Sequence, residues 1–363
     1  MNESGTQVLI MAGGTGGHVF PGLAVAEALQ QKGYRVSWLG TARGIENDVV
    51  PAAGLTLHHL SVAGVRGRGP VTKLLAPFRL CYALLQAWRL LRRLRPAVVL
   101  GMGGFAAGPG GLAARMLRIP LVIHEQNAVA GTTNRWLARV AKRRLCAFAG
   151  ALPDRFEPQV VGNPIRSQLV AVAPPDERGT GDHKPLRLLI LGGSQGALAI
   201  NQLVPEALAD LPEAQRPEVR HQCGRRHEET TRQAYRKAEV TAEIQPFIDD
   251  MAEALCWADL VVARAGALTV SELSAVGVGS LLIPFPFAID DHQTRNAERL
   301  VRVHAARLLP QSELTRDTLC AALQDSLRPT VLQTWARAAR AAGQPDATGA
   351  VVAVLEDCME IRQ

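Results

Sequence analysis

The sequence predicts an α/β protein made of two doubly wound units, each built on a parallel sheet. Short apolar runs end repeatedly in glycine-rich turns that precede amphipathic helices, and this order of elements restarts near the middle of the chain. Short buried strands that alternate with helices are typical of parallel sheets covered on both faces. The chain has 363 residues, a length that suits two ordinary domains.

In the first half, the apolar run 7–11 ends in the turn 13–18, and an amphipathic helix is expected over about 21–32. Further strands are expected at the following positions: 35–39, 97–100 and 121–124. The strand 97–100 enters a second glycine-rich turn, GMGG.

In the second half, the strand expected at 186–191 runs into GGSQGA, and later strands are expected at 260–263 and 280–284. A stretch rich in Pro, Gly and charged residues, 173–181, separates the halves and reads as a hinge. We therefore expect three parts: domain 1–163, domain 164–340, and a C-terminal helix, 341–363, that packs back on the first domain. Ligands of two such units usually bind in a cleft between them.

Composition limits the partners. The formal net charge is +7, which favours anionic partners such as nucleic acid, anionic lipids or phosphorylated substrates. Nucleic acid is not expected, because no recognised binding module and no interleaved aromatic residues accompany the charge.

Cysteine usage and the N-terminus bear on the compartment. The six Cys are scattered without a CxxC pair, which predicts reduced thiols in a cytosol. The nearest metal candidates, His221, Cys223 and His227, lack a second ligand pair, so no metal site is expected. The N-terminus lacks the pattern of a signal peptide, and no run of about 18 residues lacks charge, so any membrane role is expected to be peripheral.

A glycine-rich turn between a buried strand and a helix lets backbone N–H groups face an anion. A tight turn without a ligand is the alternative, and three such turns make it less favoured. The residues alone thus predict a phosphate- or nucleotide-binding two-domain enzyme, without naming a reaction.

An NAD-dependent dehydrogenase is the main competitor. Gly101, Gly103 and Ala106 fit GxGxxA after a strand, and Glu125 ends the next strand, but this fingerprint alone is weak. The first glycine turn does not fit it, and the strand that follows that turn ends without the acid that a ribose needs.

Eight segments, taken in order, resemble one family closely. They are GGTGGHVFPGLAVA (13–26), GMGGFAAGPGGLAA (101–114), HEQNAVAGTTNR (124–135), GNPIR (162–166), GGSQGA (192–197), FIDDM (247–251), RAGALTVSE (264–272) and DDHQTRNA (290–297). They resemble the MurG family, the UDP-N-acetylglucosamine–N-acetylmuramyl-(pentapeptide) pyrophosphoryl-undecaprenol N-acetylglucosamine transferases. The resemblance runs from the first strand to the last helix. Ala265, where relatives often have Ser, is the one departure noticed.

The resemblance implies a GT-B fold, with two Rossmann-like domains and the nucleotide sugar bound mainly by the second. It implies inverting transfer of GlcNAc from UDP-GlcNAc to the C4 hydroxyl of MurNAc in undecaprenyl-pyrophosphoryl-MurNAc-pentapeptide, which converts lipid I to lipid II in peptidoglycan synthesis. A nucleotide-sugar sensor without turnover, and a GT-B epimerase acting on UDP-GlcNAc, stay open as alternatives. No DxD motif occurs, so no metal cofactor is expected, because helix N-termini and Arg can stabilise the leaving UDP.

The resemblance also assigns residues to UDP-GlcNAc. The full set expected to bind it is Thr15, Gly16, Gly17, Asn127, Arg166, Ser194, Gln195, Gly196, Ile248, Arg264, Ala267, Leu268, Thr269, Val270, Ser271, Glu272 and Gln293. Within this set, Ser194 and the start of the helix at 267 suit the diphosphate. Glu272 is expected to bind the ribose, or else only to stabilise its helix.

Ile248 is expected to meet uracil through its backbone, and Gln293 to contact the GlcNAc hydroxyls. Arg264 is expected either to fix its loop or to neutralise phosphate, and the two readings are equally favoured.

His18 is the expected catalytic base, since an attacking sugar hydroxyl needs a proton acceptor as it attacks. The alternative is that His18 only caps the loop. Glu125 is the next catalytic candidate, although it also suits orienting a neighbour or capping a turn, and His124 is expected to be structural.

The segment 62–95 combines apolar and basic residues, which suits an anionic membrane surface. The expected contacts are Lys73, Leu75, Phe78, Arg79, Trp88, Arg89, Arg92 and Arg93. A core helix with a solvated basic face is the alternative. The polyprenyl tail of the implied acceptor favours the membrane, and peripheral association with the cytoplasmic face of the cell inner membrane is expected.

Overall fold

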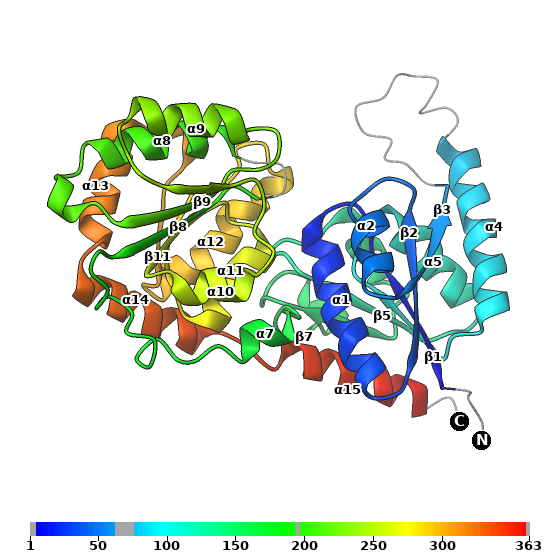
Figure 1. The fold of residues 1–363 in the computed structure, drawn as a ribbon. Helices are drawn as coiled ribbons and strands as arrows, with labels where there is room; N and C mark the ends of the chain where they lie inside the picture. Colours follow the sequence, from blue (N-terminus) through cyan, green and yellow to red (C-terminus); the bar gives the residue numbers. More distant parts are fainter. Residues whose placement is uncertain (1–4, 62–75, 194–196, 361–363) are drawn as a thin grey trace. The chain divides into compact units, whose positions relative to one another are not determined.

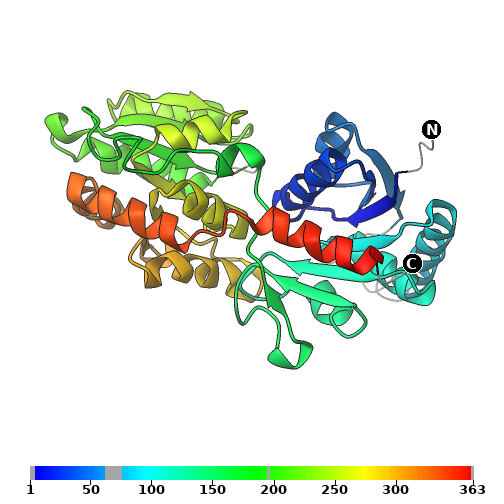
Figure 2. The ribbon, with the colours of Figure 1, turned by 90° about the horizontal axis from the view of Figure 1, so that it is seen from below.

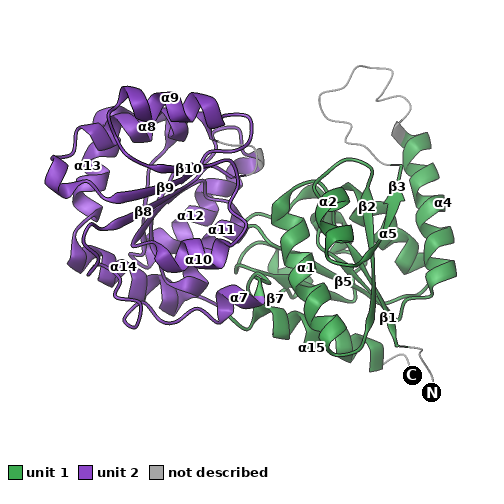
Figure 3. Ribbon diagram, in the orientation of Figure 1, with its two compact units in different colours: residues 1–166, 345–363 green, residues 167–344 purple. Residues whose placement is uncertain are grey.

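A computed structural model describes residues 5–61, 76–193 and 197–360. The chain divides into two compact units, which Figure 3 shows in different colours. Unit 1 comprises residues 1–166 and 345–363, and unit 2 comprises residues 167–344. The boundaries expected from the sequence, after 163 and after 340, lie close to these limits.

Unit 1 is built on a fully parallel seven-stranded sheet. Its elements are β1 (Gln7–Met11), α1 (Gly16–Gln31), β2 (Arg35–Thr41), α2 (Glu46–Ala52), β3 (Thr56–Leu60), α4 (Ala76–Leu94), β4 (Val98–Gly101), α5 (Gly104–Met116), β5 (Leu121–Glu125), α6 (Thr132–Leu137), β6 (Arg143–Cys146), the 3₁₀ turn Asp154–Phe156, β7 (Gln159–Val160) and α15 (Ala347–Glu360). The strand order is β3-β2-β1-β4-β5-β6-β7. Strands β1 to β3 are therefore added toward one edge of the sheet, and β4 to β7 toward the other.

Helices cover both faces of this sheet (Figures 1 and 2), and each face carries a separate core. Along β1, Val8 and Ile10 pack with α1 and α15, whereas Leu9 and Met11 pack with α4 and α5. This alternation follows from the two-residue period of a strand, and both faces of β1 are apolar because helices cover both. The last helix, α15, thereby belongs to the unit that begins the chain.

Unit 2 repeats the plan with a parallel six-stranded sheet of order β10-β9-β8-β11-β12-β13. Its elements are α7 (Ser167–Val170), β8 (Arg187–Leu191), α8 (Leu198–Ala209), the 3₁₀ turn Glu213–Gln215, β9 (Glu218–Gln222), α9 (Glu228–Lys237), β10 (Glu243–Gln245), α10 (Met251–Trp257), β11 (Leu260–Ala263), α11 (Ala267–Val276), β12 (Gly279–Leu282), the 3₁₀ turn Ile289–Asp291, α12 (His292–Arg302), β13 (Ala306–Leu308), the 3₁₀ turn Gln311–Glu313, α13 (Arg316–Ser326) and α14 (Pro329–Ala342). Two parallel, doubly wound sheets confirm the predicted fold class.

The stretch 173–181, expected to be a hinge between the halves, lies inside unit 2 and is held there by Arg178. The Arg178 guanidinium donates to backbone carbonyls at the ends of α10 and α11, among them Cys256 at 3.2 Å and Gly277 at 2.7 Å. The buried carboxylate of Asp259 accepts from the Gly181 N–H at 2.8 Å. These carbonyls have no partner within their own helices, so one cation satisfies several of them.

The helix of the first glycine turn also differs from expectation. It begins at Gly16 rather than near Pro21, so His18 lies in its first turn. Of the helices in the described ranges, none is both long enough and apolar enough to cross a membrane.

Candidate functional site

The glycine-rich turns follow the central strands of each sheet. In unit 1 they follow β1 and β4, and in unit 2 the corresponding loops follow β8 and β11. These strand pairs are where the strand order reverses, and ligands of open α/β sheets bind beyond the carboxyl ends of such strands. The fold therefore places most of the sequence-predicted site residues at the ligand-binding edge of one unit or the other.

The first glycine turn is held by hydrogen bonds to Glu46, which the sequence analysis missed. The buried Glu46 carboxylate accepts from the Gly14 N–H at 3.0 Å, and from the Thr41 N–H at 3.1 Å and hydroxyl at 2.8 Å. A Cβ at Gly13 would lie 2.6 Å from this carboxylate, so any other residue there would displace it. In the sequence, Glu46 looks like any acidic residue in a first helical turn.

Thr15 ends this turn as the N-cap of α1, and its carbonyl accepts from the His18 N–H at 3.1 Å. Gly16 and Gly17 form the first turn of the helix. Arg166, also in unit 1, lies with its guanidinium carbon 4.8 Å from the centre of the Phe20 ring. The predicted residues of 15–18 are thus brought together at one helix N-terminus, a position that favours anions.

The second glycine turn packs against the first. Gly103 has φ of +106°, and a Cβ there would lie 3.1 Å from the His18 ring. A Cβ at Gly104, with φ of +80°, would lie 2.5 Å from the carbonyl oxygen of Gly13. The glycines of GMGG are therefore explained by the close approach of α5 to the His18 turn.

His18 is the first member of a chain of hydrogen bonds. Its Nδ1 lies 2.7 Å from Oε1 of Gln126. The Gln126 amide nitrogen lies 3.0 Å from Nδ1 of His124 and 3.0 Å from the His124 carbonyl oxygen. Nε2 of His124 lies 2.8 Å from the carbonyl oxygen of Gly162. Gln126 and His124 are fully buried, and burial lowers the pKa of His124 to about 4 although its bond to Gly162 opposes that shift.

Glu125 holds the loop between β5 and α6. One carboxylate oxygen accepts from the Asn127 N–H at 3.0 Å and from its side-chain amide at 3.2 Å. The other accepts from the Gly131 N–H at 3.1 Å and from the side-chain amide of Asn134 at 2.9 Å. A carboxylate offers about four lone-pair positions. The geometry therefore favours the turn-capping reading of Glu125, while its use as a base stays a prediction.

In unit 2, Ser194, Gln195 and Gly196 lie outside the described residues, but the loop that carries them is held at Gly193. The buried Gln222 accepts from the Gly193 N–H at 2.9 Å and donates to its carbonyl at 3.0 Å. The same amide nitrogen donates to the Pro246 carbonyl at 3.1 Å. Gln222, which the sequence analysis missed, thus joins the expected diphosphate loop to the segment that leads to Ile248.

The helix expected to meet the diphosphate, α11, begins directly after β11 with Gly266 as N-cap. Val270 is buried in the core, so its side chain is unsuited to ligand contact. Glu272 is also buried, one turn into the helix. The remaining predicted residues of this helix are partly or fully buried; they are Ala267, Leu268, Thr269 and Ser271.

Arg264 and Gln293 both hold the loop that follows β12. The Arg264 guanidinium donates to the carbonyls of Ile283 and Pro284 at 3.1 and 3.0 Å, and burial lowers its pKa. The Gln293 side-chain oxygen accepts from the Phe285 N–H at 2.9 Å. Between the two readings of Arg264, these contacts favour the loop-fixing one.

Two glycosyltransferase domains match this chain. Residues 8–146 match the glycosyltransferase family 28 N-terminal domain, and residues 187–350 match the glycosyltransferase family 28 C-terminal domain. The chain is 55% identical over 362 residues to the UDP-N-acetylglucosamine–N-acetylmuramyl-(pentapeptide) pyrophosphoryl-undecaprenol N-acetylglucosamine transferase of Azotobacter vinelandii, covering 98% of this chain and 99% of the relative. It is 56% identical over 354 residues to the protein of the same name in Alkalilimnicola ehrlichii, covering 97% and 98%.

The structure agrees with these matches. The crystal structure of Acinetobacter baumannii MurG superimposes with a TM-score of 0.84 at 43% identity, covering 97% of this chain and 99% of that one. Domain matches, full-length identity and shared architecture all point to the family that the eight segments resemble. The chain therefore belongs to the MurG family within glycosyltransferase family 28.

Proposed function

We propose that this protein transfers GlcNAc from UDP-GlcNAc to the C4 hydroxyl of MurNAc in undecaprenyl-pyrophosphoryl-MurNAc-pentapeptide, converting lipid I to lipid II. The observation that carries this is the identity above one half, over almost the whole chain, with relatives named for that reaction. The arrangement around His18 agrees with it, since it offers a partly exposed imidazole beside a helix N-terminus.

The chemistry proposed is a single displacement. The C4 oxygen attacks C1 of GlcNAc while its proton passes to Nε2 of His18. The bond between C1 and the β-phosphate oxygen breaks, and UDP leaves with the electron pair. One displacement at C1 inverts an α-linkage to a β-linkage.

We assign the donor to unit 2, where most residues of the expected UDP-GlcNAc set lie. The N-terminus of α11 and the 192–197 loop suit the diphosphate, and Glu272 suits the ribose. The family resemblance also assigns to the donor five residues of unit 1, namely Thr15, Gly16, Gly17, Asn127 and Arg166. We propose that leaving-group charge is stabilised by backbone N–H groups and Arg, without a metal cofactor.

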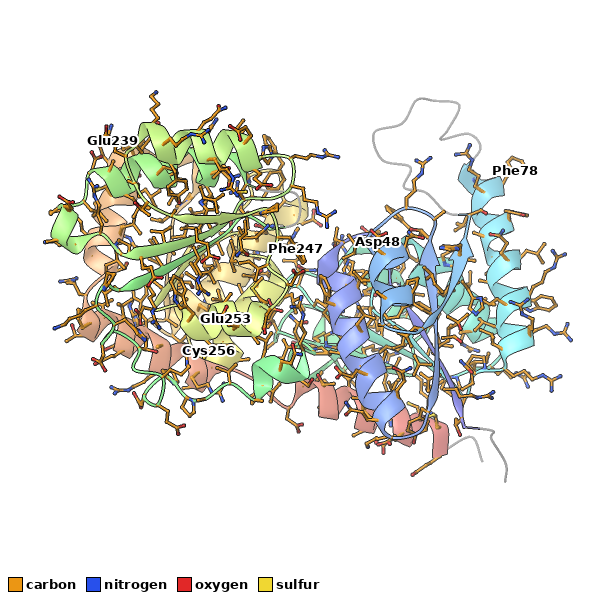
Figure 4. All side chains as sticks on the ribbon, in the orientation of Figure 1. Asp48, Phe78, Glu239, Phe247, Glu253 and Cys256 are labelled. Atoms are coloured by element: carbon orange, nitrogen blue, oxygen red, sulfur yellow. The ribbon has the colours of Figure 1, made fainter. Side chains whose placement is uncertain are left out.

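We further propose that unit 1 binds an anionic membrane surface peripherally, at the cytoplasmic face of the inner membrane. Support comes from α4, whose outward stripe begins with Phe78, Tyr82 and Leu85 and continues with Arg89 and Arg92, all exposed. These positions recur every three or four residues and so share one side of the helix. Phe78 is 73% exposed and points away from unit 1 in Figure 4.

The opposite side of α4 is core. Ala83, Ala87 and Leu91 are fully buried, and Trp88, expected to bind membrane, packs partly against the core with Arg92 4.7 Å above its ring. The helix thus has a core side, as the alternative of a core helix with a solvated basic face expects, and an apolar and basic outer side. Lys73 and Leu75 lie outside the described residues, and Arg79 and Arg93 are exposed.

Neighbouring helices of unit 1 also carry exposed apolar residues. α5 packs beside α4, and α6 packs beside α5. They add exposed apolar residues, including Met116 and Trp136, the second with the Arg139 guanidinium 4.5 Å above its ring. Apolar side chains surrounded by cations suit the headgroup region of an anionic bilayer.

A coupled UDP-release assay, run with and without a lipid-linked muramyl pyrophosphate acceptor, tests the reaction. Release that depends on the acceptor supports the transferase. Consumption of UDP-GlcNAc without acceptor would point to the epimerase, binding without turnover to a sensor, and a response to NAD or NADP titration to the oxidoreductase.

A further inference from the structure

The series of hydrogen bonds from Gly162 to His18 determines which nitrogen of each histidine carries a proton. The assignment starts at Gly162, the buried end of the series. The Gly162 carbonyl can only accept, so Nε2 of His124, 2.8 Å away, carries a proton. Burial lowers the pKa of His124 to about 4, so the imidazole is neutral near pH 7 and has that one proton. Nδ1 of His124 is therefore an acceptor.

The next link orients the Gln126 amide. One end of this amide lies 3.0 Å from two acceptors, Nδ1 of His124 and the His124 carbonyl oxygen. Only the NH₂ group can donate to both, so the other end, which faces His18, is the carbonyl oxygen. Gln126 is fully buried, so an inverted amide would set its oxygen against two acceptors without water to relieve it.

The last link sets the His18 tautomer. Oε1 of Gln126 lies 2.7 Å from Nδ1 of His18 and can only accept, so the proton of neutral His18 sits on Nδ1. Nε2 then carries the lone pair. The ring also packs closely against Gly103, where an added Cβ would lie within 3.1–3.5 Å of its atoms.

We propose that Gln126 is a positioning residue that holds His18 in the Nδ1–H tautomer, with Nε2 left as the proton acceptor of the transfer reaction. This rests on the proposed role of His18 as the base. When Nε2 takes the proton, Nδ1–H keeps donating to Gln126, so the hydrogen bond does not rearrange during the reaction. Gln126 holds the imidazole without a negative charge, unlike the carboxylate of a Ser-His-Asp triad.

The tautomer can be measured directly by ¹⁵N NMR of the full-length protein with ¹⁵N-labelled histidine, since protonated and bare ring nitrogens differ in shift. The His18 signals are assigned as those lost in His18→Ala. Wild type is expected to show Nδ1–H. Gln126→Leu should lose this preference and lower kcat roughly 10- to 100-fold, because a wrongly protonated base cannot act. KM for UDP-GlcNAc should stay within about twofold, because the donor is assigned mainly to unit 2.

Two further variants separate positioning from packing. Gln126→Glu still offers His18 an oxygen, so it should keep the Nδ1–H tautomer, with its buried carboxyl group protonated so that the second oxygen donates to His124 in place of the amide N–H. Gln30→Leu makes the same chemical change as Gln126→Leu on the exposed side of α1, and should alter neither tautomer nor kcat.

An Nε2–H tautomer in wild type, or an unchanged tautomer or kcat in Gln126→Leu, would overturn the proposal. If Gln126→Glu loses the tautomer as completely as Gln126→Leu, the side chain matters for packing and the proposal fails too. Failure of the proposed base role is separate: it would appear as near-normal kcat in His18→Ala, whatever tautomer the spectra report.

Discussion

At the scale of single residues, three buried side chains hold the loops that carry the candidate site. Glu46 holds Gly14, Gln126 holds the His18 ring, and Gln222 holds Gly193. Each of the three is a buried polar side chain that would be costly to leave without a hydrogen-bond partner. Precise placement of the loops thus depends on residues that need not touch a substrate.

Replacing His18 with Ala is expected to lower kcat by roughly 10²–10⁴-fold, the usual contribution of general base catalysis. KM for UDP-GlcNAc should move little, because a base that acts only in the transition state contributes little to ground-state binding. The acidic limb of the pH–rate profile should flatten, since a protonated imidazole cannot accept a proton. Steady-state kinetics across pH measure this, and near-normal kcat would make Glu125 the next candidate.

Two buried histidines predict a pH-dependent stability. Burial lowers the pKa of His124 to about 4 and that of His221 to about 3, against about 6.5 for an unfolded chain. Between these values the unfolded chain binds more protons, so the free energy of unfolding falls as pH drops below 6.5. From pH 7.5 to 5.5 each histidine should cost roughly 1.4 kcal/mol.

Denaturant unfolding at the two pH values checks this, with His221→Gln as the matched variant. The His221 ring bonds Tyr235 and Asn201, at 2.9 and 3.0 Å, and a Gln amide has the same donor and acceptor without titrating. The variant should lose about half of the combined pH effect. An equal pH effect in both proteins would show that His221 does not titrate on unfolding.

At the scale of elements, the loop after β8 depends on β9. Replacing Gln222 with Leu removes three hydrogen bonds to Gly193 and Pro246, and so should loosen both the diphosphate loop and the segment before Ile248. A hydrogen bond of this kind contributes about 0.5–1.5 kcal/mol net, so the loss of three should lower the affinity for UDP roughly 10- to 100-fold, because binding must then order the loop.

Calorimetric titration with UDP measures this affinity, and Gln233→Leu is the control. Gln233 lies exposed on α9 of the same unit and bonds only the Glu229 side chain among the contacts described. Unchanged affinity in Gln222→Leu would mean that the loop holds its shape without β9.

Helix α4 predicts a membrane interaction. Replacing Arg89, Arg92 and Arg93 with Glu should abolish binding to anionic vesicles, because each cation near such a surface contributes about 1 kcal/mol. Turnover of a short-chain, water-soluble acceptor should persist. Co-sedimentation with vesicles measures binding.

A charge-matched control changes three exposed cations of unit 2, namely Lys184, Arg225 and Lys237, to Glu. If net charge alone matters, this control will lose binding too. Unchanged vesicle binding by the α4 variant would mean that its basic side serves only as a solvated helix face.

At the scale of the whole molecule, two units of similar plan have different proposed roles: unit 2 binds the donor, and unit 1 supplies the base and the membrane surface. Most of the expected donor residues lie in unit 2, so UDP should protect amides mainly beyond about residue 190. Hydrogen exchange with and without UDP measures this, and protection confined to residues 13–18 would overturn the assignment.

Much of this protein could be predicted from local sequence. The predicted bounds of β1 and β11 are those of the structure. Both strands are continuous apolar runs between turns, a pattern that marks buried parallel strands. His18 stood out because it follows an unusual run of glycines. Strands with polar residues, such as β3 (TLHHL) and β9 (EVRHQ), gave no such signal.

Only the tertiary structure decided how the loops are held. His18 and Gln126 are 108 residues apart in the chain, and Gly14 and Glu46 are 32 apart. Glutamine and glutamate are ordinary surface residues in a sequence, and no local pattern marks those that fold into a buried hydrogen bond. The apolar pattern determined which segments are strands and helices, because buried side chains recur along the sequence with the period of the strand or helix that carries them. Hydrogen bonds between distant residues depend instead on direction and distance in space, which exist only once the sheet has assembled.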